Sequence, residues 1–249
     1  MKLSLKRKQK KLIVWLSSIL SGIIVICAAC GLYVNDYYRA ENAAIQTFYG
    51  STVVKKEVLK DGTVIFSPDT PKAGLIFYPG GKVEHTAYEP LMFSCMQQGI
   101  ACILVEMPLR LAVLDKNAAN GLKTHFPEIK NWFIGGHSLG GSMAASYLKK
   151  HADEFNGLIL LGAYSTVDLS QTSLRVLSMY GSKDEVLNEK KYQKYKENLP
   201  QSHEEFIING GNHAYFGMYG EQDGDGKATL TNEKQIKKAA QKIIDTILA

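Results

Sequence analysis

Two hydrophobic patterns alternate along the chain from about residue 50 to its end. Short apolar runs, typical of buried β-strands, occupy residues 73–78, 100–105, 131–135, 157–162, 175–180 and 205–208. Stretches with helical spacing separate or follow them, at residues 88–98, 142–151, 188–198 and 232–248. Short apolar strands that alternate with helices predict a mostly parallel sheet with helices on both faces, which is an α/β fold.

The start of this predicted domain has a different pattern. Residues 53–59 and 63–67 are rich in β-forming side chains, and the turn signal Lys60-Asp61-Gly62 separates them. This arrangement predicts an antiparallel hairpin attached to the parallel sheet. The predicted catalytic domain therefore covers residues 51–249, and the polar residues 35–50, which have some helical character, form a connector before it.

The N-terminal pattern is that of a membrane segment. Residues 1–11 are basic, and residues 12–34 carry no charge. A helix of this length spans a hydrocarbon layer of about 30 Å. We therefore predict a single-pass transmembrane anchor, and the positive-inside rule leaves the domain outside the cytoplasm. The alternatives are a cleaved secretory signal sequence, or lipidation at Cys30, because Ala28-Ala29-Cys30 resembles a lipoprotein processing site.

The charge distribution bears on the choice of partner. The chain has a net charge of +5, but six of its 29 basic residues lie in the first eleven positions. The remainder has 23 basic and 24 acidic residues. A nucleic-acid-binding domain carries a basic face on its folded part, so we expect no nucleic-acid partner. Cys95 and Cys102 are the cysteines of the predicted domain, and we expect small buried hydrophobes, with a disulfide between them as the alternative.

The segment with the most chemical information is residues 132–141, WFIGGHSLGG. An apolar strand leads into a serine flanked by glycines, and a helical pattern follows. This G-x-S-x-G elbow holds a serine hydroxyl at the carboxyl end of a sheet, and side chains at Gly136 or Gly140 would clash with backbone. We therefore predict that Ser138 is a nucleophile. The alternative is the turn of a nucleotide-binding fold, but no G-x-G-x-x-G follows an early strand.

A serine nucleophile needs a base, and the base needs an orienting carboxylate. In this architecture the chain order is serine, acid, histidine, each beyond the end of a strand. Asp184 follows a strand and a glycine turn, and His213 follows the last strand. We predict the triad Ser138, Asp184 and His213. Asp168 and Glu106, which also follow strands, are the alternative acids.

The oxyanion of an acyl-transfer intermediate needs backbone amide donors. One is expected from Leu139, directly after the nucleophile, and the other from the loop after the strand at residues 73–78. That loop is Pro79-Gly80-Gly81-Lys82. We predict that the N–H groups of Gly81 and Leu139 form the oxyanion hole, and the alternatives to Gly81 are the N–H of Lys82 or a plain turn without a donor.

Over residues 50–249 the sequence resembles the α/β-hydrolase fold-5 group. The segments that carry this resemblance are residues 77–83, 107–109, 135–141, 180–184, 210–214 and 216–217. The resemblance implies an α/β-hydrolase fold with the same serine, aspartate and histidine in the triad. Dienelactone hydrolases share the architecture but use cysteine, and position 138 is serine. Glu106 departs from the group, where a basic or neutral residue is expected.

These features together predict a serine hydrolase. The connections at residues 162–175 and 107–130 are too short for a lid of helical-bundle size, so we expect an open cleft. The expected reaction is cleavage of small or accessible esters, or related acyl compounds, through a Ser138 acyl-enzyme without a cofactor. An acyltransferase with the same triad and a non-catalytic, membrane-tethered binding module are the alternatives. Residues 221–232 resemble a calcium loop, but Glu221 and Asn232 stand where aspartate and glutamate are needed, so we predict no metal.

Overall fold

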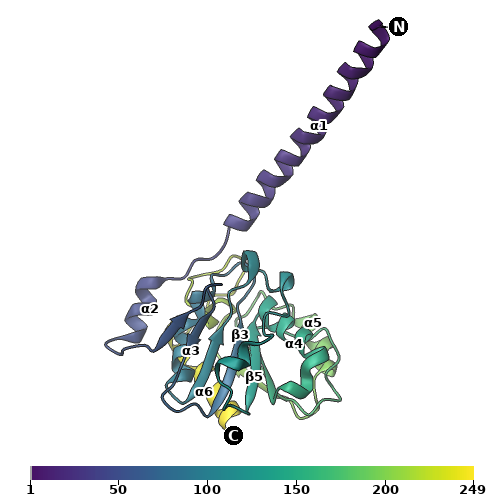
Figure 1. Cartoon of the computed structure of the whole chain (residues 1–249). Helices are drawn as coiled ribbons and strands as arrows, with labels where there is room; N and C mark the ends of the chain where they lie inside the picture. The colour runs from purple at the N-terminus through teal and green to yellow at the C-terminus, as the bar shows by residue number, and fades with distance from the viewer. Residues whose placement is uncertain (1) are drawn as a thin grey trace. The chain divides into compact units, whose positions relative to one another are not determined.

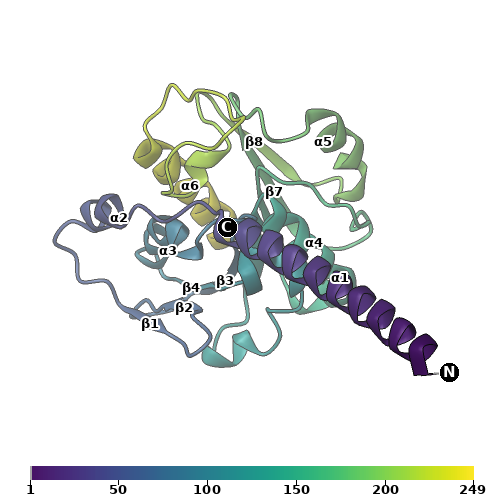
Figure 2. The ribbon, with the colours of Figure 1, turned by 90° about the horizontal axis from the view of Figure 1, so that it is seen from above.

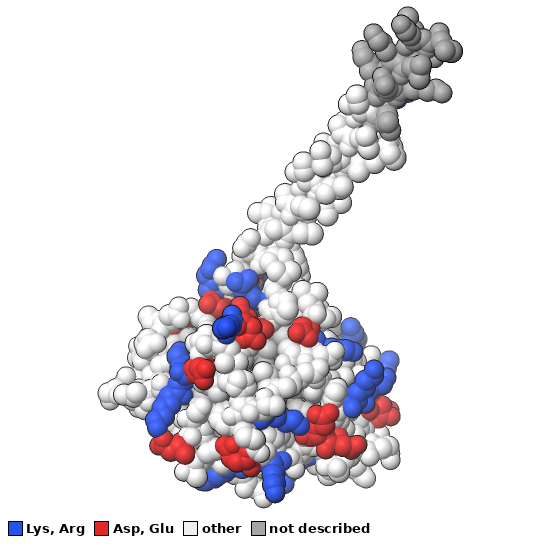
Figure 3. All heavy atoms as spheres, viewed as in Figure 1, with Lys and Arg blue, Asp and Glu red and all other residues white. Residues whose placement is uncertain are grey.

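The structure is a computed structural model that describes residues 2–249, and the side chains of residues 2–10, 12 and 14 are left undescribed. The chain forms two compact units, one up to Tyr37 and the other Tyr38–Ala249. The first consists mainly of helix α1, Lys2–Asn35. Within the described chain, Trp15–Asn35 is the one helical segment long and apolar enough to cross a membrane, with a mean hydropathy of 2.1. Its apolar side chains are exposed, and Figure 3 shows no charged side chain along this part of the helix. A signal sequence has the same properties.

One eight-stranded sheet forms the centre of the second unit, in the order β1-β2-β4-β3-β5-β6-β7-β8. The strands are β1 Lys56–Val58, β2 Val64–Phe66, β3 Ala73–Tyr78, β4 Ile100–Leu104, β5 Trp132–His137, β6 Gly157–Leu161, β7 Arg175–Gly181 and β8 Glu204–Ile208. Strands β1 and β2 form an antiparallel hairpin, β2 pairs antiparallel with β4, and all other pairs are parallel. The predicted α/β fold is confirmed. Strand β1 is shorter than its β-rich run because it is an exposed edge strand with a single partner.

Helices cover both faces of the sheet (Figures 1 and 2). Helices α2 (Asn42–Tyr49), α3 (Glu89–Met96) and α6 (Asn232–Leu248) bury their apolar side chains in one core, and α4 (Leu139–His151) buries its own in the other. Leu75 and Phe77 of β3 point into the first core, and Ile76 and Tyr78 into the second. Alternate strand residues thus enter opposite cores, which explains the continuous apolar runs of the sequence. Helix α5 (Glu189–Tyr195) lies beside β7, where the Tyr192 and Ser178 hydroxyls are 2.9 Å apart.

The expected connector is partly inside the folded unit. Ile45 and Tyr49 of α2 are buried in the core, with 2% and 6% of their surfaces exposed. Tyr38 donates its N–H to the carbonyl of Lys82 at 2.8 Å, and the N–H of Glu84 donates to the Tyr38 carbonyl at 2.9 Å. The chain therefore enters the folded unit at the loop that follows β3.

Candidate active site

Ser138 occupies the sharp turn between β5 and α4. Its backbone has φ 52° and ψ −121°, a sparsely populated conformation for a residue with a side chain, which costs about 1–3 kcal/mol. A Cβ on Gly136 would lie 2.6 Å from the carbonyl oxygen of Tyr78, and a Cβ on Gly140 would collide with the carbonyls of Tyr78 and Pro79. Glycine at these two positions therefore lets the turn pack on the end of β3 and present Ser138, half exposed, beyond the strand.

The loops after β7 and β8 bring Asp184 and His213 together. The Nδ1 atom of His213 lies 2.8 Å from Oδ2 of Asp184, and both side chains are almost completely buried. The other carboxylate oxygen, Oδ1, accepts the N–H groups of Val186 at 3.0 Å and Leu187 at 2.8 Å. Because a carboxylate only accepts hydrogen bonds, this contact assigns a proton to Nδ1 of His213, and in the neutral ring the lone pair is then on Nε2.

Nε2 of His213 is buried and has no hydrogen-bond partner among the described residues. His213 and Ser138 both line a cavity of about 260 Å³. The cavity is also lined by residues 139, 142, 162–164 and 186–188, so it lies between the elbow and the loop after β7. The sequence offered no signal for the lining residues Tyr164, Val186 and Leu187, because they become neighbours only through the fold.

The two alternative acids lie elsewhere. The carboxylate of Asp168 is exposed and accepts the N–H of Ser170, two residues along, at 2.9 Å. Hydrogen bonds from the side chain of Ser170, and secondly from its backbone N–H, lower the pKa of Asp168 below its ordinary value. Glu106 is exposed, and its side chain lies against Gly62 in the β1–β2 hairpin. Of the three carboxylates, Asp184 is the one hydrogen-bonded to His213.

The loop after β3 leaves one amide free beside the elbow. The N–H of Gly80 donates to the Tyr88 hydroxyl at 3.1 Å, and the N–H of Lys82 donates to the carbonyl of Arg110 at 2.9 Å. No hydrogen bond within the described residues uses the N–H of Gly81, and a Cβ at that position would lie 3.3 Å from Cβ of Leu139. Leu139 is the first residue of α4, so its N–H lacks a partner inside the helix. These two free donors therefore lie on adjoining backbone.

His137, directly before Ser138, adds a buried polar contact that the sequence analysis did not identify. Its Nδ1 atom is 2.7 Å from the hydroxyl of Tyr88, and its ring centroid is 4.4 Å from that of His213. Burial, and secondly the charge of His213, lowers the pKa of His137 well below its ordinary value. The neutral ring therefore accepts the Tyr88 O–H. A histidine inside the elbow motif was the one available signal, and its partner is 49 residues distant.

The neutral state of His137 predicts a pH dependence of stability. In the unfolded chain a histidine binds a proton below about pH 6.5, so acid favours the unfolded state, which then holds more protons. We expect the free energy of unfolding to be at its full value above about pH 6.5 and to fall below it, by up to about 1.4 kcal/mol per pH unit for this group. Urea titrations between pH 7.5 and 5.5, followed by the fluorescence of the buried Trp132, measure it.

The matched variants are His137→Gln and His125→Gln, because His125 is an exposed histidine. We expect a shallower pH slope for His137→Gln and the wild-type slope for His125→Gln. An unchanged slope in His137→Gln would show that His137 does not titrate on unfolding.

Solved structures of hydrolases share this fold. A dienelactone hydrolase from Anabaena variabilis is similar with a TM-score of 0.57 and 15% identity, over 79% of this chain and 96% of that one. The protein Est1E from Butyrivibrio proteoclasticus has a TM-score of 0.54 and 12% identity, over 80% and 100% of the two chains. A thermophilic esterase from Thermogutta terrifontis has a TM-score of 0.55 and 12% identity, over 78% of this chain and 97% of that one. At these identities the similarity establishes the fold alone.

Among curated proteins, none matches this sequence. The model of the alpha/beta hydrolase family matches residues 74–237, from the first residues of β3 into α6. This range contains the elbow, both loops that carry Asp184 and His213, and the loop of Gly81. The chain therefore belongs to the alpha/beta hydrolase family.

Proposed function

We propose that this protein is a serine hydrolase that cleaves small or accessible esters, or related acyl compounds, through an acyl-enzyme on Ser138. The observation that carries the proposal is the state of His213. Its Nδ1 is hydrogen-bonded to Asp184, its Nε2 is buried without a partner among the described residues, and His213 lines the same cavity as Ser138. A histidine with its proton on Nδ1 can accept a proton at Nε2, and the hydroxyl of a serine nucleophile supplies that proton.

The proposed reaction has two halves. Oγ of Ser138 attacks the carbonyl carbon of the substrate while Nε2 of His213 takes the hydroxyl proton, and the N–H groups of Gly81 and Leu139 stabilise the oxyanion. The imidazolium then gives its proton to the leaving group, which leaves the acyl group on Ser138. In the second half, Nε2 of His213 removes a proton from water, the resulting hydroxide attacks the acyl carbon, and Ser138 is released with its proton restored. Asp184 fixes the tautomer of His213 and stabilises the imidazolium.

We further propose that α1 is a single-pass membrane anchor and that the catalytic domain lies outside the cytoplasm. The apolar segment Trp15–Asn35 and the basic residues that precede it support this topology. The protein would then act on substrates of the extracytoplasmic space without being released into it.

The first prediction from the proposed function concerns the three residues of the proposed triad. Ser138→Ala and His213→Ala are expected to abolish hydrolysis of p-nitrophenyl acetate while the protein keeps its fold. Asp184→Asn should lower kcat by at least about a hundredfold, because the histidine loses its tautomer control. The matched controls Asp168→Asn and Glu106→Gln should stay within about tenfold of the parent. A crippled Asp168→Asn beside an active Asp184→Asn would contradict the assignment of the acid.

Two further measurements separate the alternative functions. Labelling of Ser138 by a fluorophosphonate distinguishes either enzyme from a binding module, which would not react. Product analysis with and without an acceptor alcohol then distinguishes hydrolysis from acyl transfer. We expect labelling, and the free acid as the main product in both conditions.

The second prediction concerns the size of the acyl group. Ligand pockets for drug-sized molecules have volumes of about 300–1,000 Å³, and the cavity beside Ser138, at about 260 Å³, lies just below that range. We expect kcat/KM for p-nitrophenyl butyrate to exceed that for the dodecanoate by at least about tenfold. Equal or higher values for the dodecanoate would show that the acyl chain binds elsewhere.

The third prediction concerns the proposed topology. We expect the intact protein in the membrane fraction, resistant to extraction by high salt and carbonate. In protoplasts, external protease should digest the domain after Asn35. Release of the domain into the medium with a new N-terminus near Cys30 would contradict the anchor, and protection from protease would contradict the orientation.

A further inference from the structure

The loop between β8 and α6 carries His213 in its first part, and its second part folds back against that first part and against the loop of Asp184. One carboxylate in this loop, that of Asp225, binds the backbone next to each of those residues. Its Oδ2 accepts the N–H of Ala214 at 2.8 Å. Its Oδ1 accepts the N–H of Glu185 at 3.3 Å and that of Gly226 at 2.8 Å. A single half-buried side chain thus bridges the residue after the proposed acid and the residue after the proposed base.

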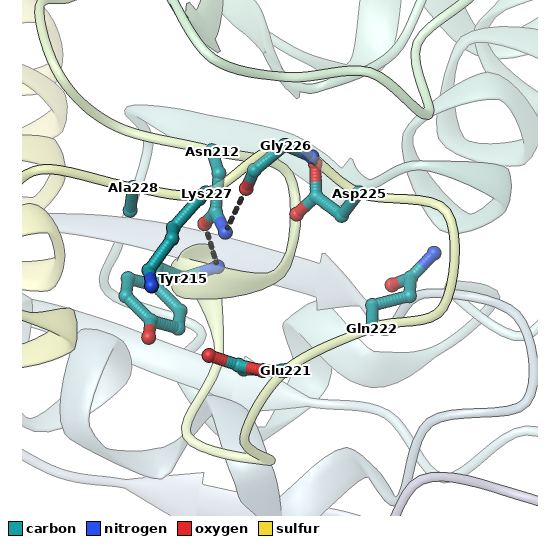
Figure 4. Close-up of a pocket in the computed structure, with 8 residues that line it drawn as sticks. All are labelled: Asn212, Tyr215, Glu221, Gln222, Asp225, Gly226, Lys227 and Ala228. Carbon is teal, nitrogen blue, oxygen red and sulfur yellow. Dashed lines mark hydrogen bonds between the residues drawn. The ribbon is translucent and has the colours of Figure 1, made fainter.

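The next residue, Gly226, brings the segment into direct contact with the acid loop. A Cβ at Gly226 would collide with the carbonyl of Lys183 and lie 3.1 Å from Cγ of Glu185. The carbonyl of Gly226 accepts the side-chain N–H of Asn212 at 3.0 Å, and Oδ1 of Asn212 accepts the N–H of Tyr215 at 3.1 Å (Figure 4). Asn212, Asp225 and Gly226 therefore form one polar cluster behind His213.

The cluster lies beyond the ends of β7 and β8, where strand pairing no longer joins the segments that carry Asp184 and His213. The β7–β8 pairing ends at Gly181 and Ile208. The hydrogen bond from the N–H of Lys183 to the carbonyl of Gly211, at 2.8 Å, continues the contact for a short distance. Beyond this hydrogen bond, Asp225 and Gly226 contact the residues next to Asp184 and next to His213, whose side chains are 2.8 Å apart.

We propose that Asp225 is a positioning residue that sets the geometry of the Asp184–His213 pair, an inference that rests on the proposed function. A carboxylate suits this role because both of its oxygens accept hydrogen bonds. Asparagine has the same shape but a single acceptor oxygen. In Asp225→Asn the amide group would face the N–H of Ala214 or of Glu185, and one loop would lose its contact.

The first test compares Asp225→Asn with Asp223→Asn in the full-length protein, with p-nitrophenyl acetate as the substrate. Asp223 is an exposed residue of the same loop, so its substitution removes the same charge. Because misplacement of catalytic groups by about 1 Å can cost a hundredfold, we expect kcat of Asp225→Asn to fall by about ten- to a hundredfold, with KM within about threefold of the parent. Asp223→Asn should retain the parent kcat. Equal kcat values for the two variants would overturn the proposal.

A double-mutant cycle separates positioning from a general structural effect. If Asp225 acts through the Asp184–His213 pair, its substitution has little left to change once Asp184 is asparagine. We therefore expect Asp184→Asn/Asp225→Asn to keep kcat within about threefold of Asp184→Asn alone. If the loss of kcat in the double variant equalled the product of the losses in the two single variants, Asp225 would act independently of the pair, and the proposal would be contradicted.

Two controls make the outcome specific. If Asp225→Asn fails to fold, Asp225→Glu keeps the charge and moves the carboxylate by one methylene; we expect at least a tenfold loss of kcat, and parental activity would contradict the proposal. Ser138→Ala is measured in parallel. An active Ser138→Ala would overturn the proposed function itself, whereas an inactive Ser138→Ala beside a fully active Asp225→Asn would overturn the role of Asp225 alone.

Discussion

Close contact between the end of β3 and the β5–α4 turn is the constraint from which the rest of the site follows. The carbonyls of Tyr78 and Pro79 occupy the space where side chains at Gly136 and Gly140 would be. Because glycine has no side chain at these two positions, the turn can pack this closely and hold Ser138 in its strained conformation. The same contact brings the first amide of α4, that of Leu139, next to the loop of Gly81. One packing contact therefore positions Ser138 and both free N–H donors.

The proposed acid and base depend on a second, separate set of contacts. Asp184 and His213 are carried by β7 and β8, and Asp225 and Gly226 bind both of their loops. The Ser138 turn and the Asp184–His213 pair meet at two places. The ring centroids of His137 and His213 are 4.4 Å apart, and position 162 beside them has no side chain. A Cβ on Gly162 would lie 2.8 Å from Nδ1 of His213 and 3.2 Å from Oδ2 of Asp184. Glycine there, with φ at 52°, leaves room for the hydrogen-bonded pair Asp184 and His213 beside β6.

The sequence predicted those features that depend on local pattern. Each strand of the parallel sheet, the hairpin and the elbow shows its pattern within a few consecutive residues, and the family match supports the same fold. Helix α2 was not predicted as part of the core because its eight residues are too few to show a clear period, and their burial depends on distant partners. The contacts of Tyr88 with His137 and of Asp225 with Glu185 join residues 49 and 40 positions apart. No spacing rule connects such pairs, so the fold alone identifies them.

The central claim of this account is that acyl groups pass through Ser138. Its most direct test is acid quenching of the full-length protein during turnover of p-nitrophenyl butyrate, followed by peptide mass spectrometry. The account predicts a butyryl adduct, an added mass of about 70 Da, on the peptide that contains Ser138, formed faster than it decays and absent from Ser138→Ala. Turnover without any adduct on Ser138, or with an adduct on another residue, would contradict it.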